Sequence, residues 1–392
     1  MLIIPEKTEI VEKELYKPAG LYIHIPYCKR KCSYCNFHFS TNLRTKNLLF
    51  NALIFEIETR SAEGDSFIIQ SIYFGGGTPS LLNESELNKL LNTIRTNYKL
   101  TKNPEITLEA NPDDLNPGYL DQLLQLGINR LSIGVQSFHE PDLRWMNRAH
   151  NVKQSHDAIE FTIQAGFSNF SIDLMYGLPG QNYQSWLKNL EHVLGYQAPH
   201  FSAYALTLEE KTDLYKKVQL NTIQLPEEFS NLTQMDCLLD FCDAHSYEAY
   251  EISNFSKKSF RAKHNSAYWE GVPYFGFGPA AHSYLGDIRR WNIANNNLYI
   301  QAIENNLIYF ETEVLSKKNH CNEYLMLQLR RIEGLDLGYI EQHFGEFFSY
   351  IKSQVLKQIE IGNMTIINEK YCLTRKGKYI ADLISVNLFV GL

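Results

Sequence analysis

The sequence predicts an α/β fold, in which a partial (β/α)6 barrel of the TIM type precedes a small winged-helix-like C-terminal domain. Six β-like runs alternate with longer amphipathic segments up to about residue 207, which indicates a parallel sheet with helices packed outside it. After about residue 220 the pattern changes to short strands and loops rich in glycine and aromatic residues. We therefore expect a barrel domain (1–220), a barrel extension (221–310) and the C-terminal domain (311–392).

Hydrophobic periodicity predicts the individual elements. The β-like runs are short, and the segments between them carry apolar residues at helical spacing. Six such units suit an open barrel better than a closed eight-fold one. A hairpin is expected near the C-terminus, turning at 368–370. The predicted strands are 20–26, 71–77, 105–110, 130–137, 169–179 and 200–207, and the clearest helices are 47–60, 85–98, 119–127 and 227–245.

The composition is that of a globular protein, with 44% apolar and 21% charged residues among 392. The net charge of −7 argues against a general nucleic-acid binder. We recognise no secretory signal and no apolar run of about 20 residues, the length of a membrane helix, so a cytoplasmic location is expected. Four of the seven cysteines are scattered and are expected to be ordinary buried thiols: Cys237, Cys242, Cys321 and Cys372.

The other three cysteines lie within eight residues, in "CKRKCSYC". In a reducing compartment such a cluster suggests metal rather than disulfides. Cys28, Cys32 and Cys35 offer soft thiolates that suit zinc or an iron–sulfur cluster. Zinc would need a fourth ligand, which His24 or His38 could supply. A four-iron cluster would use three thiolates and leave its fourth iron open to another ligand.

Polar and glycine residues follow successive predicted strands. Cys28, the Gly75–Thr78 segment, Glu109, Gln136 and Asp173 each lie at or just after a strand. In barrels of this type the chemistry lies on loops at the carboxyl ends of the strands, so these residues are expected to share one mouth. Glycine lets the backbone approach a ligand closely, and the carboxylate and amide side chains can bind its polar groups.

The C-x3-C-x2-C spacing resembles that of the radical S-adenosylmethionine (SAM) superfamily. That resemblance implies a [4Fe-4S] cluster whose open iron binds the amino and carboxylate groups of SAM, and whose electron cleaves SAM to a radical. The segments "LYIHIPYCKRKCSYCNF", "FGGGTPSLL", "LEANP", "NRLSIGVQSF" and "IDLMYGLPGQ" resemble one family within it, which contains oxygen-independent coproporphyrinogen III oxidases and HemW-type haem chaperones. The resemblance implies a SAM pocket made of Tyr22, Tyr34, Gly76, Gly77, Thr78, Glu109, Gln136, Arg148 and Asp173.

Three features favour the chaperone group within this family. The oxidase pattern has a further cysteine where Phe37 stands here, and the oxidases carry a longer segment than the 27 residues that precede Cys28. In addition, "HNSAYW" (264–269) resembles the haem signature of the chaperones, which implies His264 as an axial haem ligand. His282, in the glycine-rich loop expected at 276–284, is a second candidate contact.

The resulting hypothesis is a haem chaperone that binds the cluster, SAM and haem. It would deliver haem to acceptor proteins, with respiratory proteins at the membrane implied by resemblance, and it would need a reducing electron donor. Lys29, Arg30 and Lys31 could steer an acidic donor to the cluster. The alternatives are an oxidase that decarboxylates coproporphyrinogen III and a zinc-stabilised α/β protein without radical chemistry.

Overall fold

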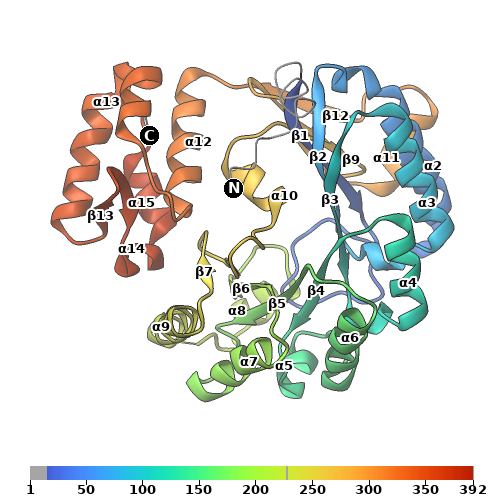
Figure 1. Ribbon diagram of the computed structural model, residues 1–392, viewed down its shortest axis with the longest axis horizontal. Helices are drawn as coiled ribbons and strands as arrows, with labels where there is room; N and C mark the ends of the chain where they lie inside the picture. The colour runs from blue at the N-terminus through green and yellow to red at the C-terminus, as the bar shows by residue number, and fades with distance from the viewer. Residues whose placement is uncertain (1–15, 227, 392) are drawn as a thin grey trace, which may run out of the picture. The chain divides into compact units, whose positions relative to one another are not determined.

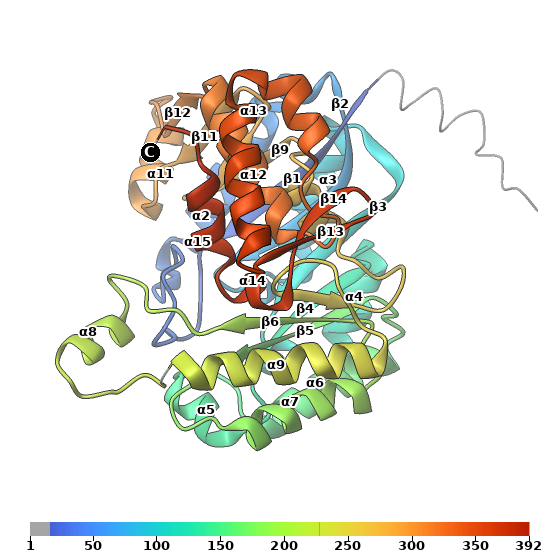
Figure 2. The same cartoon turned by 90° about the vertical axis from the view of Figure 1, so that its left-hand side faces the viewer.

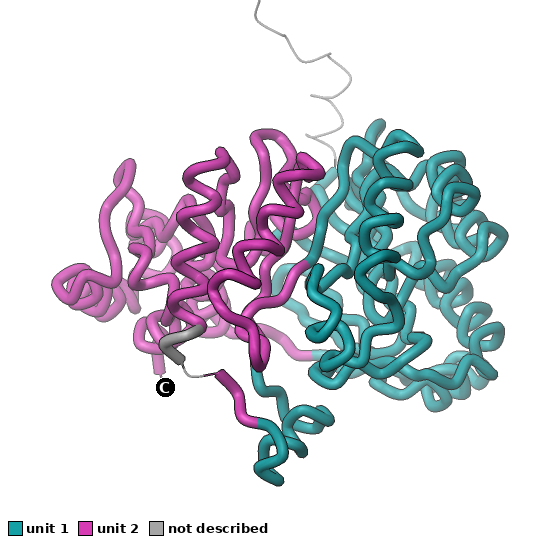
Figure 3. Tube along the Cα trace, turned by 90° about the horizontal axis from the view of Figure 1, so that it is seen from below, with its two compact units in different colours: residues 1–173, 207–223, 272–312 teal, residues 174–206, 224–271, 313–392 magenta. Residues whose placement is uncertain are grey.

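The computed structural model describes residues 16–226 and 228–391. The chain forms two compact units, each assembled from separate segments (Figure 3). Unit 1 consists of Met1–Asp173, Thr207–Ile223 and Val272–Thr312, and unit 2 consists of Leu174–Leu206, Gln224–Gly271 and Glu313–Leu392. The three-part division expected from the sequence stays a prediction.

Parallel strands form the centre of unit 1. β1 pairs with β2, β2 with β3 and β3 with β4, all in parallel, as the alternation of elements predicts. Fully buried aliphatic side chains such as Leu21, Ile72 and Leu108 lie on these strands and form part of the core. The strands are β1 (Lys17–Ile25), β2 (Phe67–Gly76), β3 (Leu100–Ala110), β4 (Arg130–Gln136) and β5 (Phe170–Tyr176), which unit 1 contains as far as Asp173.

Helices α2, α3 and α4 lie on the outer side of these strands (Figure 1). Capping residues define their ends: Asn83 and Glu86 form a capping box at the start of α3, and Gly127 ends α4 in a left-handed conformation, as predicted. Among its described residues, unit 1 has the helices α2 (Lys46–Thr59), α3 (Glu84–Asn97), α4 (Pro117–Leu126), α5 (Glu140–Trp145), α6 (Val152–Gln164), α8 (Asp213–Gln219) and α11 (Asn296–Glu304).

A second set of strands extends the sheet beyond β1. β9 (Tyr274–Phe277) pairs in parallel with β1, and β10 (His282–Tyr284) and β11 (Ile288–Asn292) continue in antiparallel order. The sequence-based expectation of one glycine-rich loop over 276–284 is therefore wrong at both ends. Glycine is uncommon inside strands, so residue propensities do not predict a strand at Gly276. Glycine is nevertheless required there, because a Cβ would lie 2.0 Å from the carbonyl oxygen of His282.

A buried ion pair ties α2 to this extension. Glu56 is fully buried, and its carboxylate accepts hydrogen bonds from Arg60 (2.8 Å), from the backbone N–H of Gly278 (2.8 Å) and from Tyr299 (2.5 Å). A buried carboxylate is tolerated only when its oxygens are satisfied in this way. The network thus holds the turn after β9, and Tyr299 of α11, against α2.

Unit 2 contains a small antiparallel sheet and a C-terminal helical group. Figure 2 shows α12 to α15 gathered around the β13–β14 hairpin, whose turn at Asn368 and Glu369 has positive φ and was predicted. The four scattered cysteines are buried, as expected. The elements are β6 (His200–Ala205), β7 (Glu248–Ala249), β8 (Asn254–Ser256), α7 (Tyr183–Gly195), α9 (Glu228–His245), α10 (Lys263–Trp269), α12 (Lys317–Arg330), α13 (Leu337–Glu360), β13 (Met364–Ile367), β14 (Lys370–Leu373), α14 (Arg375–Tyr379) and α15 (Ala381–Leu388); β12 (Phe310–Val314) spans the last boundary between the units.

Across the described ranges, no helix combines the length and the apolar character needed to cross a membrane.

Candidate functional site

The loop that carries the three clustered cysteines follows β1 directly. Its start is held by backbone hydrogen bonds between Cys28 and Ser40 (3.1 Å), and its middle by the bond from Ser33 N–H to the carbonyl of Met146 (3.1 Å). All three cysteines are free thiols with intermediate exposure. The loop is therefore held at its start and in its middle while its three cysteines stay partly exposed.

Each of the three sulfur atoms has its own hydrogen-bond donor. Thr78 donates its hydroxyl to the Sγ of Cys28 (3.4 Å), and Arg148 donates Nη1 to the Sγ of Cys32 (3.4 Å). The third donor is the backbone N–H of Phe37, which bonds Cys35. Burial raises the pKa of the Cys28 thiol to about 11, and burial also raises that of Cys35. Binding metal at these thiols therefore requires that protons leave.

The two histidines that could supply a fourth zinc ligand already have hydrogen-bond partners. Among residues 16–226 and 228–391, no three His, Cys, Asp or Glu side chains converge as ligands of one metal ion. Both ring nitrogens of His24 are engaged, by Tyr22 (3.2 Å) and by the carbonyl of His38 (2.9 Å), and His38 Nε2 bonds Asn296 (2.7 Å). Three soft thiols in separate environments fit an iron–sulfur cluster, in which each thiolate binds a different iron.

The three basic residues of the loop are anchors. Lys29 forms ion pairs with Asp113 (2.7 Å) and Asp114, and Lys31 pairs with Asp213 (2.9 Å). Arg30 donates to the carbonyl of Arg148 (3.3 Å). The loop is thus fixed to the turn after β3, to α8 and to the segment after α5.

The glycine segment after β2 packs against the end of β1. Gly76 has φ of +105°, and a Cβ there would lie 2.6 Å from the ring of His24. A Cβ on Gly77 would lie 2.7 Å from the backbone of Tyr27. Both positions therefore demand glycine for packing alone. They also bring Thr78 beside Cys28.

Glu109 lies in a cluster of aromatic residues on neighbouring strands. Tyr73 donates its hydroxyl to Glu109 Oε1 (2.7 Å), and its ring stacks on that of Tyr22 with centroids 6.1 Å apart. Burial raises the pKa of Glu109 to about 7, with the Tyr73 bond opposing and the Asp173 charge adding to the shift. Tyr73 was missed in the sequence, because strand alternation gives the face of a residue but not the register that places it opposite Tyr22.

The remaining predicted pocket residues lie at the end of β4, within β5, in the cysteine loop and after α5. Gln136 ends β4 with φ of +68°, a conformation that non-glycine residues adopt rarely and often at functional sites. Arg148 Nη2 donates to the carbonyl of Gly134 (2.7 Å), and a hydrogen bond also joins Arg148 to Tyr34. Asp173 accepts hydrogen bonds from Ser132 (2.7 Å) and Ser171 (2.9 Å). All the residues expected in the SAM pocket therefore belong to unit 1.

The predicted haem ligand belongs to unit 2. His264 lies on α10 and not in an aromatic loop as expected, because 263–269 forms a helix. It is 2% exposed, and its Nε2 is 2.9 Å from the hydroxyl of Tyr268 one turn later. The second candidate, His282, lies on β10 in unit 1, where its ring stacks on Trp291.

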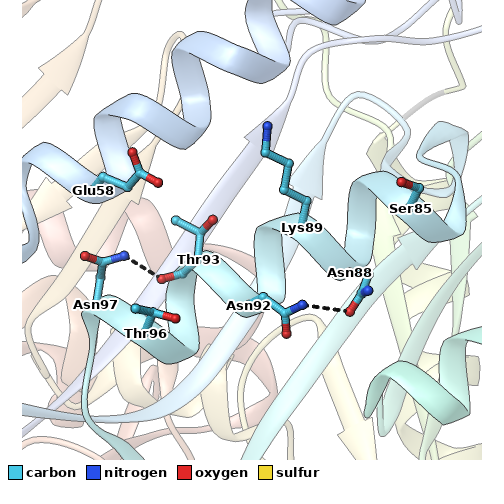
Figure 4. A pocket seen from close by; sticks show the side chains of 8 residues that line it. All are labelled: Glu58, Ser85, Asn88, Lys89, Asn92, Thr93, Thr96 and Asn97. Carbon is cyan, nitrogen blue, oxygen red and sulfur yellow. Dashed lines mark hydrogen bonds between the residues drawn. The ribbon is translucent and has the colours of Figure 1, made fainter.

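Two surface cavities of unit 1 differ in their relation to this site. One of about 420 Å³ lies between α2 and α3 and is lined by polar side chains such as Glu58, Asn88 and Lys89, none of which was predicted to act (Figure 4). Another of about 880 Å³ is lined by Cys35 and by Phe37, which is 68% exposed. The cysteine loop therefore adjoins the second of these cavities.

Two family models match the chain. Residues 22–193 match the Radical SAM superfamily, and residues 315–380 match the HemN C-terminal domain. The first match contains the three clustered cysteines and all the predicted SAM-pocket residues. A radical SAM domain implies a [4Fe-4S] cluster and SAM as cofactors.

Individual relatives cover nearly the whole chain. Heme chaperone HemW of Bacillus subtilis is 35% identical over 369 residues, which are 92% of this chain and 96% of the relative. Heme chaperone HemW of Lactococcus lactis is 34% identical, covering 91% of this chain and 93% of the relative. The solved structure of coproporphyrinogen III oxidase (HemN) from Escherichia coli matches with a TM-score of 0.83 at 23% identity, covering 98% of this chain and 93% of that one, which shows the shared α/β fold. This chain thus belongs to the HemW family of radical SAM proteins.

Proposed function

We propose that this protein is a haem chaperone that holds a [4Fe-4S] cluster, SAM and haem and passes haem to acceptor proteins. The observation that carries the proposal is the arrangement of three free thiols, each with its own hydrogen-bond donor, beside the strand ends that bear the candidate SAM residues. The similarity to Heme chaperone HemW from two organisms supports haem as the cargo.

In this proposal Cys28, Cys32 and Cys35 hold the cluster, which supplies an electron to SAM when both are bound. Because the chain provides three thiolates at this place, Cys28, Cys32 and Cys35 would hold the cluster and would leave a position open to SAM. The ionised Glu109 would accept hydrogen bonds from the ammonium group or ribose of SAM, and Asp173 would bind ribose. The candidates that line the rest of the pocket are Tyr22, Tyr34, Gly76, Gly77, Thr78, Gln136 and Arg148.

His264 is the proposed axial haem ligand. Its Nε2 is engaged with Tyr268, so binding iron there requires that this hydrogen bond be given up. Tyr268 contacts it one turn later on α10, and Tyr268 and Trp269 could cover an apolar haem face.

The cell-level part of the proposal follows from the same family resemblance. We place the protein in the cytoplasm, supplied by a reducing electron donor, with haem acceptors that include respiratory proteins at the membrane. The alternative, an oxidase acting on coproporphyrinogen III, would use the same cluster and pocket. Phe37, which stands where the oxidases have a further cysteine, favours the chaperone.

A paired titration tests the proposal on the anaerobically reconstituted full chain. Haem binding is followed by its Soret absorption, and coproporphyrinogen III with SAM and reductant is followed by product formation. Stoichiometric haem binding without turnover is expected. Turnover of the porphyrinogen without stable haem binding would contradict the chaperone and favour the oxidase.

A further inference from the structure

Asn111 connects the donors of two cluster thiols. It follows β3 directly and begins the short helical turn Pro112–Asp114. Its Oδ1 accepts a hydrogen bond from Arg148 Nη2 (2.8 Å), and its Nδ2 donates to Thr78 Oγ1 (3.4 Å). Because Arg148 also bonds Cys32 and Thr78 also bonds Cys28, the side chain of Asn111 stands between two of the three cysteines.

The polarity of the Asn111 amide determines where the proton of Thr78 points. A guanidinium only donates, so the side facing Arg148 must be the amide oxygen, and the NH2 group then faces Thr78. Thr78 accepts that bond with an oxygen lone pair, which leaves its single proton free for Cys28. An asparagine at this position therefore directs one donor to each of two sulfur atoms.

The backbone around Asn111 keeps this amide in place. Its N–H donates to Ser80 Oγ (3.2 Å), and Ser80 in turn donates to Asp114 (2.6 Å). The same turn holds the cysteine loop through Asp113 and Asp114, which pair with Lys29 between the first two cysteines. The turn after β3 thus holds the loop through its charges while Asn111 orients donors toward its sulfurs.

We propose that Asn111 is a positioning residue that raises the reduction potential of the cluster. Hydrogen bonds to cysteine sulfur and nearby positive charge stabilise the reduced, more negative form of a cluster, so they make reduction easier. Asn111 acts through both, since it aims the Thr78 hydroxyl at Cys28 and the Arg148 guanidinium at Cys32. This inference rests on the proposed function, because it assumes that the three thiols hold the cluster.

The decisive variant is Asn111→Asp, which nearly preserves shape but can only accept hydrogen bonds. Its carboxylate would draw the Thr78 proton away from Cys28 and neutralise Arg148. The matched control is Asn116→Asp, which adds the same charge nearby at the N-cap of α4, where Asp accepts the bond from Tyr119 N–H equally well. Asn111→Ser removes the amide without adding charge, and Thr78→Val removes the hydroxyl itself.

The measurement is an anaerobic potentiometric titration of the reconstituted full-length variants, followed by electron paramagnetic resonance, with iron and sulfide content and the thermal midpoint as controls for folding. We expect a more negative midpoint potential in Asn111→Asp than in Asn116→Asp, and a smaller shift in the same direction in Asn111→Ser. In a Thr78→Val background, the Asn111→Asp shift should diminish, because the two residues act through one bond.

Equal shifts in Asn111→Asp and Asn116→Asp would overturn the inference, and so would an undiminished shift in the Thr78→Val background. Failure of the proposed function would look different. In that case the wild-type chain would hold no four-iron cluster, or the resonance signal of its cluster would not respond to SAM.

Discussion

The cysteine site of unit 1 and the histidine site of unit 2 are built in different ways. The cysteine site draws on residues far apart in the chain: Arg148 reaches Cys32 across 116 positions, and Thr78 reaches Cys28 across 50. The histidine site is local, because His264 and Tyr268 are four positions apart on one helix. Folding is thus needed to assemble the first, whereas one turn of α10 suffices for the second.

Because of this difference, the two sites are unequal as evidence for function. Convergence of donors from several elements on three sulfurs has few structural explanations other than a cofactor. A buried histidine bonded to a tyrosine one turn away is also a common structural feature of helices. Experiments that act on one site and leave the other intact therefore test the comparison directly.

The largest effect is expected from Cys32→Ala. Loss of one thiolate should abolish the cluster while the fold remains, because the aliphatic core of β1 to β4 does not depend on metal. Iron and sulfide analysis with circular dichroism checks both parts. Cys242→Ala, which removes a buried thiol of unit 2, is the matched control and should retain the cluster. An unfolded Cys32→Ala protein would show that metal supports folding after all.

His264→Ala is expected to weaken haem binding by about 100-fold, which corresponds to about 2.7 kcal/mol, and to leave the cluster intact. Loss of the axial ligand is the physical reason. Soret titration of the reconstituted protein measures the affinity, and His343→Ala, an exposed histidine on α13, serves as control. Unchanged haem affinity in His264→Ala would remove this residue from the haem site and leave the histidine site as a structural feature.

Glu109 is expected to make SAM binding depend on pH. Its pKa of about 7 means that the carboxylate is largely protonated below neutrality, and only the ionised form can pair with an ammonium group. SAM affinity should therefore rise as pH increases from 6 to 8, by about tenfold, the worth of one charged hydrogen bond of about 1.5 kcal/mol. Glu109→Gln should bind weakly and lose this pH dependence, as measured by equilibrium binding. A pH profile that Glu109→Gln retains would assign the titration to another group.

Local patterns in the sequence predicted the first parallel strands and the cysteine loop, whereas the candidate pocket was implied by resemblance to the family. The strand β9 was missed since Gly276 and its neighbours resemble a loop, and its pairing with β1 depends on a contact between segments more than 200 residues apart. Asn111 and Tyr73 were missed for the same reason: nothing in "LEANP" or "SIYFGGG" says which side chains across the sheet they meet.

The smallest effects should come from the charges that anchor the cysteine loop, and they should differ between two lysines. Lys31 forms one exposed pair with Asp213, so Lys31→Gln should lower the free energy of unfolding by less than about 1 kcal/mol. Lys29→Gln should cost more, about 1–3 kcal/mol, because Asp113 and Asp114 are largely buried and would lose their cationic partner. Urea unfolding of the two variants measures the difference. If both variants lost the same free energy of unfolding, the backbone hydrogen bonds alone would hold the loop. The turn after β3 would then contribute to the cysteine site only through Asn111.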